Sequence, residues 1–292
     1  METDKLFDEY YEKSLIHGGT SCCPGCGGPI FWRMALEVIG PNTIIYGGAP
    51  CAGCAMRNIK LPMFGLHFSF VADGATGIVA ALAAKGRKDV AVISAGGDGA
   101  IGDIGFGKVS AAAERNENMI QLCIDNEAYM NTGIQKSGLT PLGAWTTTTP
   151  QGKENPKKRV PMVLAQHGIP YVATVSVAYP RDLKAKMEKA MAINGFRYIH
   201  TVMPCPTGWR FNPAKSVEVV RLGVQTWAWP LYEIENGVLR LTMKPEHKPV
   251  QEYLNAQGRF RRLTDEQVEF IQKQVDTERK RLLESDGKSI LF

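Results

Sequence analysis

The chain has 292 residues, of which 44% are hydrophobic and 22% charged, as in an average globular protein. This composition excludes a disordered or fibrous chain. The longest apolar run, Ile78 to Ala84, is far shorter than the roughly 20 residues of a membrane-spanning helix. The net charge is +5 and basic residues are interleaved with acidic ones, so neither nucleic acid nor a membrane is an expected partner.

The amino terminus and the cysteines both indicate a reducing compartment. The chain starts with polar residues and no apolar core follows them, so we expect no export signal and a cytoplasmic location. The seven cysteines are an odd number and include two C-x-x-C spacings, Cys23/Cys26 and Cys51/Cys54. In the cytosol such clusters hold a metal or carry out redox chemistry more often than they form disulfides.

Strands and helices are predicted to alternate along residues 40–204. The predicted strands are residues 43–46, 89–94, 119–124, 171–176 and 196–203, and the predicted helices are residues 30–39, 76–85, 104–115, 161–167 and 181–193. This alternation predicts an α/β protein with a doubly wound, mainly parallel sheet. Such sheets bind ligands at the carboxyl ends of their strands.

The last third of the chain has a different pattern. Asn236-Gly237 between two apolar stretches indicates a β-hairpin, and Thr264 followed by Gln267 is typical of a helix start. One face of that helix is apolar, with Val268, Ile271, Val275 and Leu282. We therefore predict an α/β domain at residues 1–205 and a C-terminal hairpin and helix extension at residues 206–292, which wraps the core or a partner subunit.

The first candidate site combines Asp98-Gly99 with Asp125-Asn126. Each pair follows a predicted strand, so the two loops can be neighbours at one edge of the sheet. Asp98, Asn126 and a backbone carbonyl near Ala128 offer the oxygen ligands that Mg²⁺ prefers, and Mg²⁺ usually keeps a phosphate in its shell. The glycines at positions 96, 97 and 99 let a diphosphate approach the backbone. Each motif alone could be an ordinary turn, but together they predict a metal–diphosphate site.

The second candidate site is formed by cysteines. Spacing alone selects two pairs as ligands of a structural zinc or a [4Fe–4S] cluster: Cys23, Cys26, Cys51 and Cys54. Cys205 stands alone between two prolines after a strand. Cys123 lies inside an apolar strand and is expected to be a small buried hydrophobe, and Cys22 is not expected to be a ligand.

Seven motifs carry a resemblance to a known family. They are Cys23-Pro-Gly-Cys-Gly27, Gly97-Asp-Gly99, Asp103-Ile-Gly-Phe-Gly107, Ala113-Glu-Arg-Asn-Glu117, Asp125-Asn-Glu-Ala-Tyr-Met-Asn-Thr-Gly133, Gly168-Ile-Pro-Tyr-Val-Ala-Thr174 and Pro204-Cys-Pro-Thr-Gly-Trp209. Together they resemble the β subunit of the 2-oxoacid:ferredoxin oxidoreductases, especially the pyruvate type. The resemblance implies a sheet of the thiamine-diphosphate-binding type and three cofactors: thiamine diphosphate, Mg²⁺ and a [4Fe–4S] cluster.

The resemblance also implies site residues. The implied cluster ligands are Cys23, Cys26, Cys51 and Cys205, so Cys205 takes the place that spacing gave to Cys54. The implied Mg²⁺ ligands are Asp98, Asn126 and the carbonyl of Ala128. The remaining implied cofactor-binding residues are Gly97, Gly99, Asn131 and Thr132, of which Asn131 matches a position close to the substrate and is the one catalytic candidate.

The implied reaction is the oxidative decarboxylation of a small 2-oxo acid, dependent on coenzyme A, with electrons passed through the cluster to ferredoxin. The family's cofactor-activating glutamate lies on a partner subunit, so we expect activity only with α-, γ- and δ-type subunits. No general base is assigned here. The glutamates at 117 and 127 and the histidines at 67, 167 and 200 are interpreted as structural.

The chain departs from the family pattern in one segment. It reads Gly48-Ala-Pro-Cys51 where pyruvate-type relatives usually have Ala-Thr-Gly-Cys, and residues 52–68 differ as well. This segment lies near the active site in the family, so pyruvate is the first candidate substrate, and oxalate or another 2-oxo acid is the alternative.

Two other classes of protein compete with this interpretation. A non-redox thiamine-dependent decarboxylase or carboligase would share Asp98 and Asn126 but leaves the cysteines without a role. A zinc-stapled α/β binding module would explain the cysteines but not the Asp98–Asn126 pair.

Overall fold

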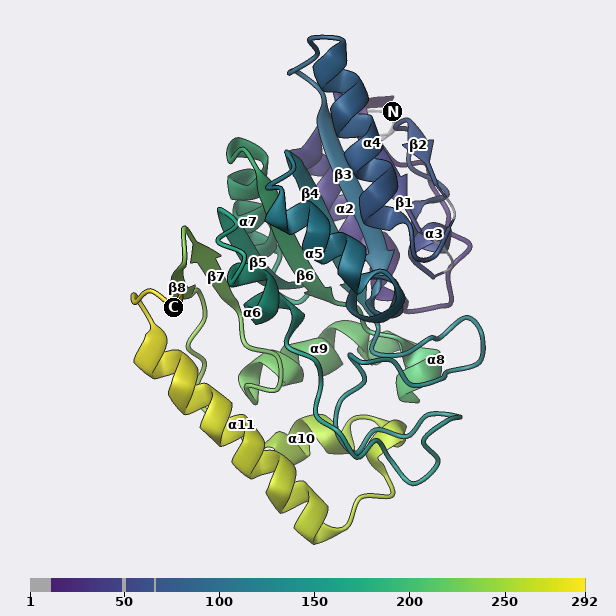
Figure 1. Cartoon of the computed structure of the whole chain (residues 1–292). Coiled ribbons are helices and arrows are strands. Elements are labelled where there is room, and N and C mark those ends of the chain that lie inside the picture. The colour runs from purple at the N-terminus through teal and green to yellow at the C-terminus, as the bar shows by residue number, and fades with distance from the viewer. Residues whose placement is uncertain (1–11, 49–50, 66, 292) are drawn as a thin grey trace, which may run out of the picture.

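The computed structural model describes residues 12–48, 51–65 and 67–291. A single eight-stranded sheet runs through its centre in the order β2-β1-β3-β4-β6-β5-β7-β8 (Figure 1). The strands are β1 (Thr43–Gly47), β2 (Met63–Phe64), β3 (Ala91–Gly97), β4 (Met119–Asp125), β5 (Tyr171–Ser176), β6 (Phe196–Val202), β7 (Tyr232–Glu235) and β8 (Val238–Leu241). The first six are parallel, and β7 and β8 continue the sheet in antiparallel fashion. The predicted doubly wound, mainly parallel sheet is therefore confirmed.

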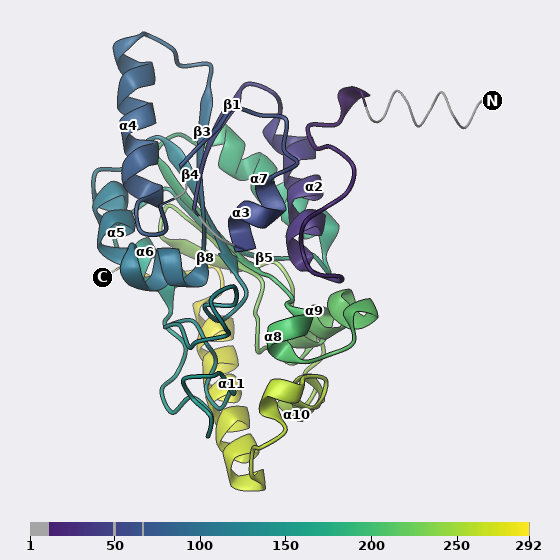
Figure 2. The same cartoon turned by 90° about the vertical axis from the view of Figure 1, so that its right-hand side faces the viewer.

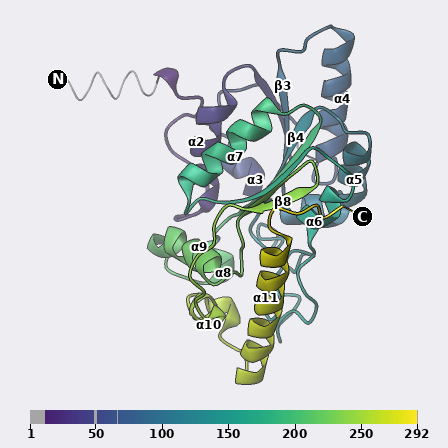
Figure 3. The same cartoon turned by 90° about the vertical axis from the view of Figure 1, so that its left-hand side faces the viewer.

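Helices cover both faces of the sheet (Figures 2 and 3). One face carries α2 (Gly27–Ile39), α3 (Cys51–Met56) and α7 (Pro180–Ala192), and the other carries α4 (Val71–Ala84), α5 (Phe106–Glu114) and α6 (Val160–Ala165). An apolar core lies on each side, because the central strands are buried on both faces; Trp32 and Ile93 belong to one core, Ile101 and Phe196 to the other.

A second group of elements lies beyond the carboxyl ends of the parallel strands (Figure 1). It consists of the long loop after β4 and of four helices, α8 (Pro206–Trp209), α9 (Ser216–Gln225), α10 (Val250–Asn255) and α11 (Asp265–Ser285). Arg159 of the loop forms an ion pair of 2.9 Å with Glu278 of α11. Loop and extension therefore enclose the edge of the sheet where ligands are expected.

The C-terminal signals are confirmed. Asn236 and Gly237 have φ of +48° and +81°, as a tight hairpin turn between β7 and β8 requires. Thr264 Oγ1 accepts a hydrogen bond from Gln267 N, and Gln267 Oε1 accepts one from Thr264 N, which forms the capping box of α11. Two residues of the predicted apolar face of this helix, Ile271 and Leu282, are buried.

Other boundaries differ from the sequence prediction. α4 begins at Val71 rather than residue 76, and a π-helical turn, Ala100–Ile104, precedes α5. The short helices α3, α8 and α10 were not predicted, because one or two turns are too short for a hydrophobic period. α9 was also missed, although its buried Val219, Val220 and Val224 do have helical spacing. Across the described residues we find no helix with the length and hydropathy needed to span a membrane.

Candidate cofactor and metal site

The two predicted carboxyl-end loops meet at one edge of the sheet. Strands β3 and β4 are parallel neighbours, with Gly97 paired to Ile124, so Asp98 and Asn126 leave adjacent strands at nearly the same level. They open into a cavity of about 240 Å³. Eight of the residues predicted for the site line it: Cys51, Gly97, Asp98, Gly99, Asn126, Ala128, Asn131 and Thr132.

Three polar groups face a common point in this cavity. One end atom of the Asn126 amide lies 3.1 Å from Asp98 Oδ1 and 2.7 Å from the Ala128 carbonyl oxygen. Without a cation, the NH₂ group fits there and donates to both oxygens. With a cation, the amide can turn so that three oxygens face one another. Around an octahedral Mg²⁺ with ligands at about 2.1 Å, neighbouring oxygens lie about 3 Å apart, so the three groups fit this ion.

The electrostatics of Asp98 also suit a cation. The residue is buried, and no lysine, arginine or histidine of the described chain forms an ion pair with it. Burial, and next the negative charge of Asp125, raise the pKa of Asp98 well above its ordinary value, although Ser137 Oγ donates a hydrogen bond to Asp98 Oδ2. A bound divalent cation would supply the missing positive charge.

The glycines around Asp98 differ in what a side chain at each position would contact. A Cβ on Gly99 would lie 2.3 Å from the ring of Tyr129, and one on Gly96 would lie 3.1 Å from Ile101, so these two positions serve internal packing. At Gly97 the nearest atom would be 3.9 Å away, and this residue lines the cavity. Gly97 is thus the glycine whose missing side chain leaves room for a ligand. That a diphosphate approaches the backbone at Gly96, Gly97 and Gly99 stays a prediction.

Asn131 and Thr132 lie on the wall of the cavity and are exposed. Thr132 Oγ1 donates a hydrogen bond of 2.5 Å to Gln135 Oε1, and Thr132 O accepts one from Gln135 Nε2 at 2.8 Å. Within the described residues the side chain of Asn131 forms no hydrogen bond, so it can contact a bound molecule.

The four cysteines implied as cluster ligands come from three separate places in the chain, because Cys23 and Cys26 share one loop. Cys26 caps α2, where its Sγ accepts from Gly28 N at 3.5 Å, and Cys205 caps α8, where its Sγ accepts from Gly208 N at 3.3 Å. The two caps are joined, because Gly27 N donates to Pro204 O at 3.2 Å. Cys51 begins α3 and lines the cavity described above. Residues 49 and 50, in the segment that departs from the family pattern, lie outside the described residues.

The thiols influence one another electrostatically. Burial raises the pKa of Cys51 to about 12, with further contributions from Cys205, Cys54 and Cys23. Burial likewise raises the pKa of Cys26 to about 12, and Cys22 and Cys205 add to the effect. Such thiols remain protonated at neutral pH unless a metal centre binds them.

These cysteines do not converge on a single point. Within the described parts of the chain, no three cysteine, histidine or carboxylate side chains lie close enough to hold one metal ion. A four-iron cluster separates its thiolate ligands more widely than a single zinc ion does. Cys123 is fully buried in β4, as expected.

A buried charge network lies directly behind the cavity. Asp125 Oδ2 bonds His200 Nε2 at 2.9 Å and Lys157 Nζ at 2.7 Å, and Lys157 Nζ also bonds Glu127 Oε1 at 2.7 Å. Burial acts to raise the pKa of Asp125, but Lys157 and His200 outweigh it and hold this pKa below its ordinary value. The structural interpretation of His200 and Glu127 agrees with these contacts, since both side chains have protein partners.

The sequence did not reveal Lys157, Ser137, Trp209 or Arg259 as part of this neighbourhood. Trp209 ends one of the motifs, but the motif alone assigns it no contact. Ser137 and Lys157 of the long loop and Arg259 of the extension lie outside the motifs. Their roles depend on tertiary contacts that a single sequence does not encode in any short spacing.

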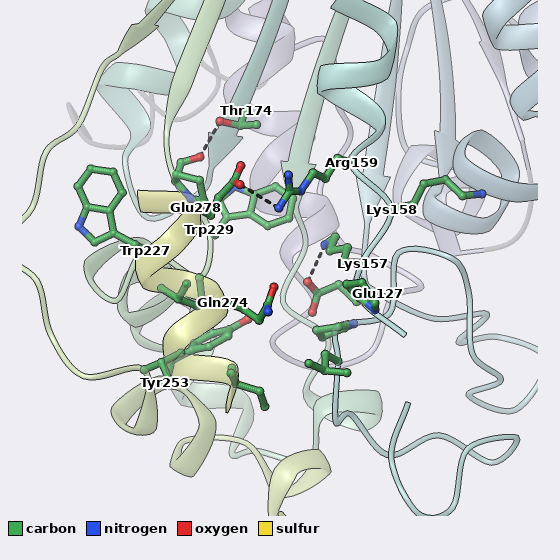
Figure 4. A pocket seen from close by; sticks show the side chains of 18 of the residues that line it. Glu127, Lys157, Lys158, Arg159, Thr174, Trp227, Trp229, Tyr253, Gln274 and Glu278 are labelled. Atoms are coloured by element: carbon green, nitrogen blue, oxygen red, sulfur yellow. Dashed lines mark hydrogen bonds and ion pairs between the residues drawn. The ribbon is translucent and has the colours of Figure 1, made fainter. Parts of the chain in front are cut away.

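A second cavity of about 250 Å³ lies on the other side of the network, between the sheet edge, the long loop and the extension (Figure 4). Glu127 and Lys157 form one wall, and Trp229, Tyr253 and Gln274 lie opposite them. The side chain of Glu127 thus points away from the cavity that contains Asp98.

The fold and the first cavity together define a thiamine-diphosphate-dependent enzyme. Residues 65–201 match the family described as "Thiamine pyrophosphate enzyme, C-terminal TPP binding domain". The 2-oxoglutarate:ferredoxin oxidoreductase of Magnetococcus marinus, solved with 2-oxoglutarate, coenzyme A and succinyl-CoA, has a similar fold, with a TM-score of 0.59 and 23% identity over 72% of this chain and 79% of that chain.

Curated relatives narrow the class to one family. The chain is 48% identical to the pyruvate synthase subunit PorB of Methanothermobacter thermautotrophicus, over 91% of this chain and 96% of that protein. It is 42% identical to the ketoisovalerate oxidoreductase subunit VorB of Pyrococcus horikoshii, over 96% of each. The chain belongs to the β subunits of the 2-oxoacid:ferredoxin oxidoreductases, which confirms the resemblance read from its motifs.

Proposed function

We propose that the chain holds Mg²⁺ and the diphosphate of thiamine diphosphate through Asp98, Asn126 and the Ala128 carbonyl, and holds a [4Fe–4S] cluster through Cys23, Cys26, Cys51 and Cys205. One observation carries this proposal: Cys51 and the three facing oxygen ligands line the same cavity. A metal–diphosphate site and a cluster ligand this close together fit a redox enzyme. A carboligase gives no reason for the cysteines, and a zinc module gives no reason for the oxygens.

When bound, thiamine diphosphate supplies the nucleophile and electron sink for cleaving a 2-oxo acid, and the cluster supplies the first electron acceptor. The chain's own residues bind and orient. Asp98 contributes negative charge to the metal, Gly97 gives the diphosphate room, and Asn131 on the cavity wall can donate a hydrogen bond to the substrate. Amide groups of Gly28 and Gly208 donate to Cys26 and Cys205 and thereby stabilise the thiolate form.

No general base is available in the cavity. Among the described residues that line it there is neither glutamate nor histidine. This agrees with the family resemblance, which implies that the cofactor-activating carboxylate lies on a partner subunit. Ile104, a lining residue with 59% of its surface exposed, and Phe70, with 47%, offer apolar area to that partner. The complex would include α-, γ- and δ-type subunits and would deliver electrons to ferredoxin in the cytoplasm. Residues 206–292 would form an extension that packs against the core or a partner subunit.

Pyruvate is the proposed substrate, with coenzyme A as acceptor. The four PorB relatives are 43–48% identical to the chain, while three VorB relatives are 41–42% identical. 2-Oxoisovalerate is the second candidate on the strength of those VorB relatives. Oxalate and other 2-oxo acids remain alternatives because residues 48–68 depart from the pyruvate-type pattern.

The test is a turnover assay on the purified complex with pyruvate, 2-oxoisovalerate, 2-oxoglutarate, phenylglyoxylate and oxalate, with and without coenzyme A. We expect pyruvate to give the highest kcat/KM for reduction of ferredoxin and to require coenzyme A. A broad visible absorption that dithionite bleaches would accompany it. Decarboxylation without ferredoxin reduction, in a colourless complex, would refute the redox function and favour the carboligase class.

A further inference from the structure

Glu127 lies between two proposed Mg²⁺ ligands but points away from the metal. Its backbone has φ of +67°, a left-handed conformation that is uncommon for a residue with a side chain. This conformation turns Asn126 and the Ala128 carbonyl toward one cavity and the Glu127 side chain toward the other (Figure 4). The carboxylate is bound there by Lys157 Nζ and by Arg259 Nη2. The contacts of Glu127 therefore help to fix the conformation that presents both metal ligands.

Arg259 belongs to the C-terminal extension and is 3% exposed. Its guanidinium bonds Glu127, and its Nε donates to Gln257 Oε1 at 2.9 Å. Its planar face stacks on the ring of Trp209 with a distance of 4.1 Å to the ring centre. Burying an arginine charge costs free energy unless the charge is paired, and here Glu127 pairs it. The three neighbours together hold the guanidinium in one orientation.

Trp209 connects the same arginine to the two ligand loops. Its Nε1 donates to the Asn126 carbonyl oxygen at 2.8 Å. Its backbone N donates to the Cys205 carbonyl oxygen at 2.8 Å, within the turn that carries this cysteine. One aromatic ring thus touches the metal-binding loop at one side and belongs to the cluster-binding turn at the other, with Arg259 stacked on its face.

Arg259 also places a positive charge near Cys205. The guanidinium stacks on Trp209, whose backbone N donates to the Cys205 carbonyl oxygen, so its charge lies beside the turn that carries this cysteine. Net charge around an iron–sulfur cluster is one of the factors that set its reduction potential. A fixed positive charge favours the form with the extra electron.

We propose that Arg259 is a positioning residue that fixes the metal-binding loop and the Cys205 turn relative to each other, and that its charge stabilises the reduced cluster. The inference rests on the proposed function. It assigns to the extension a direct part in the site, because Arg259 reaches both loops from residues 258–260, far along the chain from either.

The test uses the assembled complex with Arg259→Gln, Arg259→Lys and the matched control Arg261→Gln, an exposed arginine two residues away. Iron content, the midpoint potential of the cluster by EPR-monitored titration, and the Kd for Mg²⁺–thiamine diphosphate by calorimetry on cofactor-stripped complex are measured. In Arg259→Gln we expect unchanged iron, a more negative potential and a Kd at least about tenfold higher. Arg259→Lys keeps the charge but not the planar fork, so its potential stays near wild type while its Kd rises.

Arg261→Gln should match wild type in the midpoint potential of the cluster and in the Kd for Mg²⁺–thiamine diphosphate. A wild-type potential or a wild-type Kd in Arg259→Gln would overturn the proposal. If that variant does not assemble, the double variant Glu127→Gln/Arg259→Met leaves no unpaired charge at this contact and should fold with the same weakened cofactor binding; wild-type Kd would overturn the proposal there too. Absence of iron or of Mg²⁺-dependent thiamine binding in the wild-type complex would instead overturn the proposed function.

Discussion

Asp98 combines burial with the lack of a neutralising partner, and this gives it two opposite effects. In the empty chain its charge is unfavourable, since burial raises its pKa. In the loaded chain, by the proposed assignment, the same charge would bind Mg²⁺. We expect Asp98→Asn to raise the melting temperature of the cofactor-free protein by about 2–4 °C, the equivalent of about 1 kcal/mol.

The same variant should lose at least about a hundredfold in Mg²⁺-dependent affinity for thiamine diphosphate, because a charged metal ligand is replaced by a neutral one. Thermal melting with and without Mg²⁺–thiamine diphosphate measures both effects on one sample. An Asp98→Asn protein that is stabilised by the cofactor as much as wild type would contradict the metal assignment.

Cys205 and Cys54 offer a matched pair for the cluster assignment. Cys205 caps α8 beside the Cys26 cap, whereas Cys54 lies one turn after Cys51 in α3 and its backbone carbonyl accepts from Ser21 Oγ. We expect Cys205→Ser to lose most of its iron and Cys54→Ser to keep at least about three quarters of it, since one of four thiolates is missing only in the first. Equal iron content in the two variants would contradict the assignment of Cys205, and iron loss only in Cys54→Ser would favour the ligands that spacing selects.

At the level of elements, the contact between the starts of α2 and α8 holds the two cysteine caps together. A Cβ on Gly27 would lie 2.4 Å from Cδ of Pro204, a rigid ring that cannot turn aside. Gly27→Ala should therefore separate the caps, destabilise the protein by about 1–3 kcal/mol and lower its iron content. Gly77 in α4 is the control, since a Cβ there meets nothing within 4 Å. Gly77→Ala should stabilise by about 0.5–1 kcal/mol and leave iron unchanged.

The long loop after β4 depends on one buried lysine. Lys153 Nζ donates to the carbonyl oxygens of Gly138, Thr140 and Pro156, and burial, aided by Lys157 and Lys136, lowers its pKa to about 8. The unfolded chain then binds more protons than the folded one between pH 8 and about 10.4, so the folded state gains stability as pH rises.

Over pH 8 to 10 we expect the free energy of unfolding of wild type to rise by about 2 kcal/mol relative to Lys153→Met, which lacks this titration. Urea unfolding at both pH values measures the difference. A control variant at the exposed Lys280 of α11 should run parallel to wild type. If the free energy of unfolding of Lys153→Met and of wild type changed equally between pH 8 and 10, burial of the Lys153 ammonium would not lower its pKa.

Elements also show what the sequence could predict. Apolar runs and glycine breaks predicted β3, β4 and the residues just after them, because the end of a strand is a local signal. Arg259 and Trp209 did not, since their importance comes from contacts across more than 80 positions. The close approach of the Tyr129 ring to Gly99 could not be predicted either, because the two residues lie about 30 positions apart.

At the scale of the whole molecule, the cavity that contains Asp98 has metal ligands but an incomplete set of catalytic groups. Its described lining holds the metal ligands and Cys51 but neither glutamate nor histidine, and Ile104 beside it exposes apolar surface. A chain with this cavity should bind its cluster without partners, since all four proposed cysteines are its own. It should not turn over a 2-oxo acid, since the described lining holds no glutamate or histidine that could activate the cofactor by moving a proton.

We therefore expect the isolated chain, purified without oxygen, to show a visible absorption that dithionite bleaches, and less than about 1% of the pyruvate turnover of the complex, in line with the loss of a general base of roughly 10²-fold or more. Adding the partner subunits should restore turnover, and a partner lacking its cofactor-activating carboxylate should restore assembly but not turnover. Full activity of the chain by itself would place the missing base within this subunit, and the exposed apolar rim would then need another explanation.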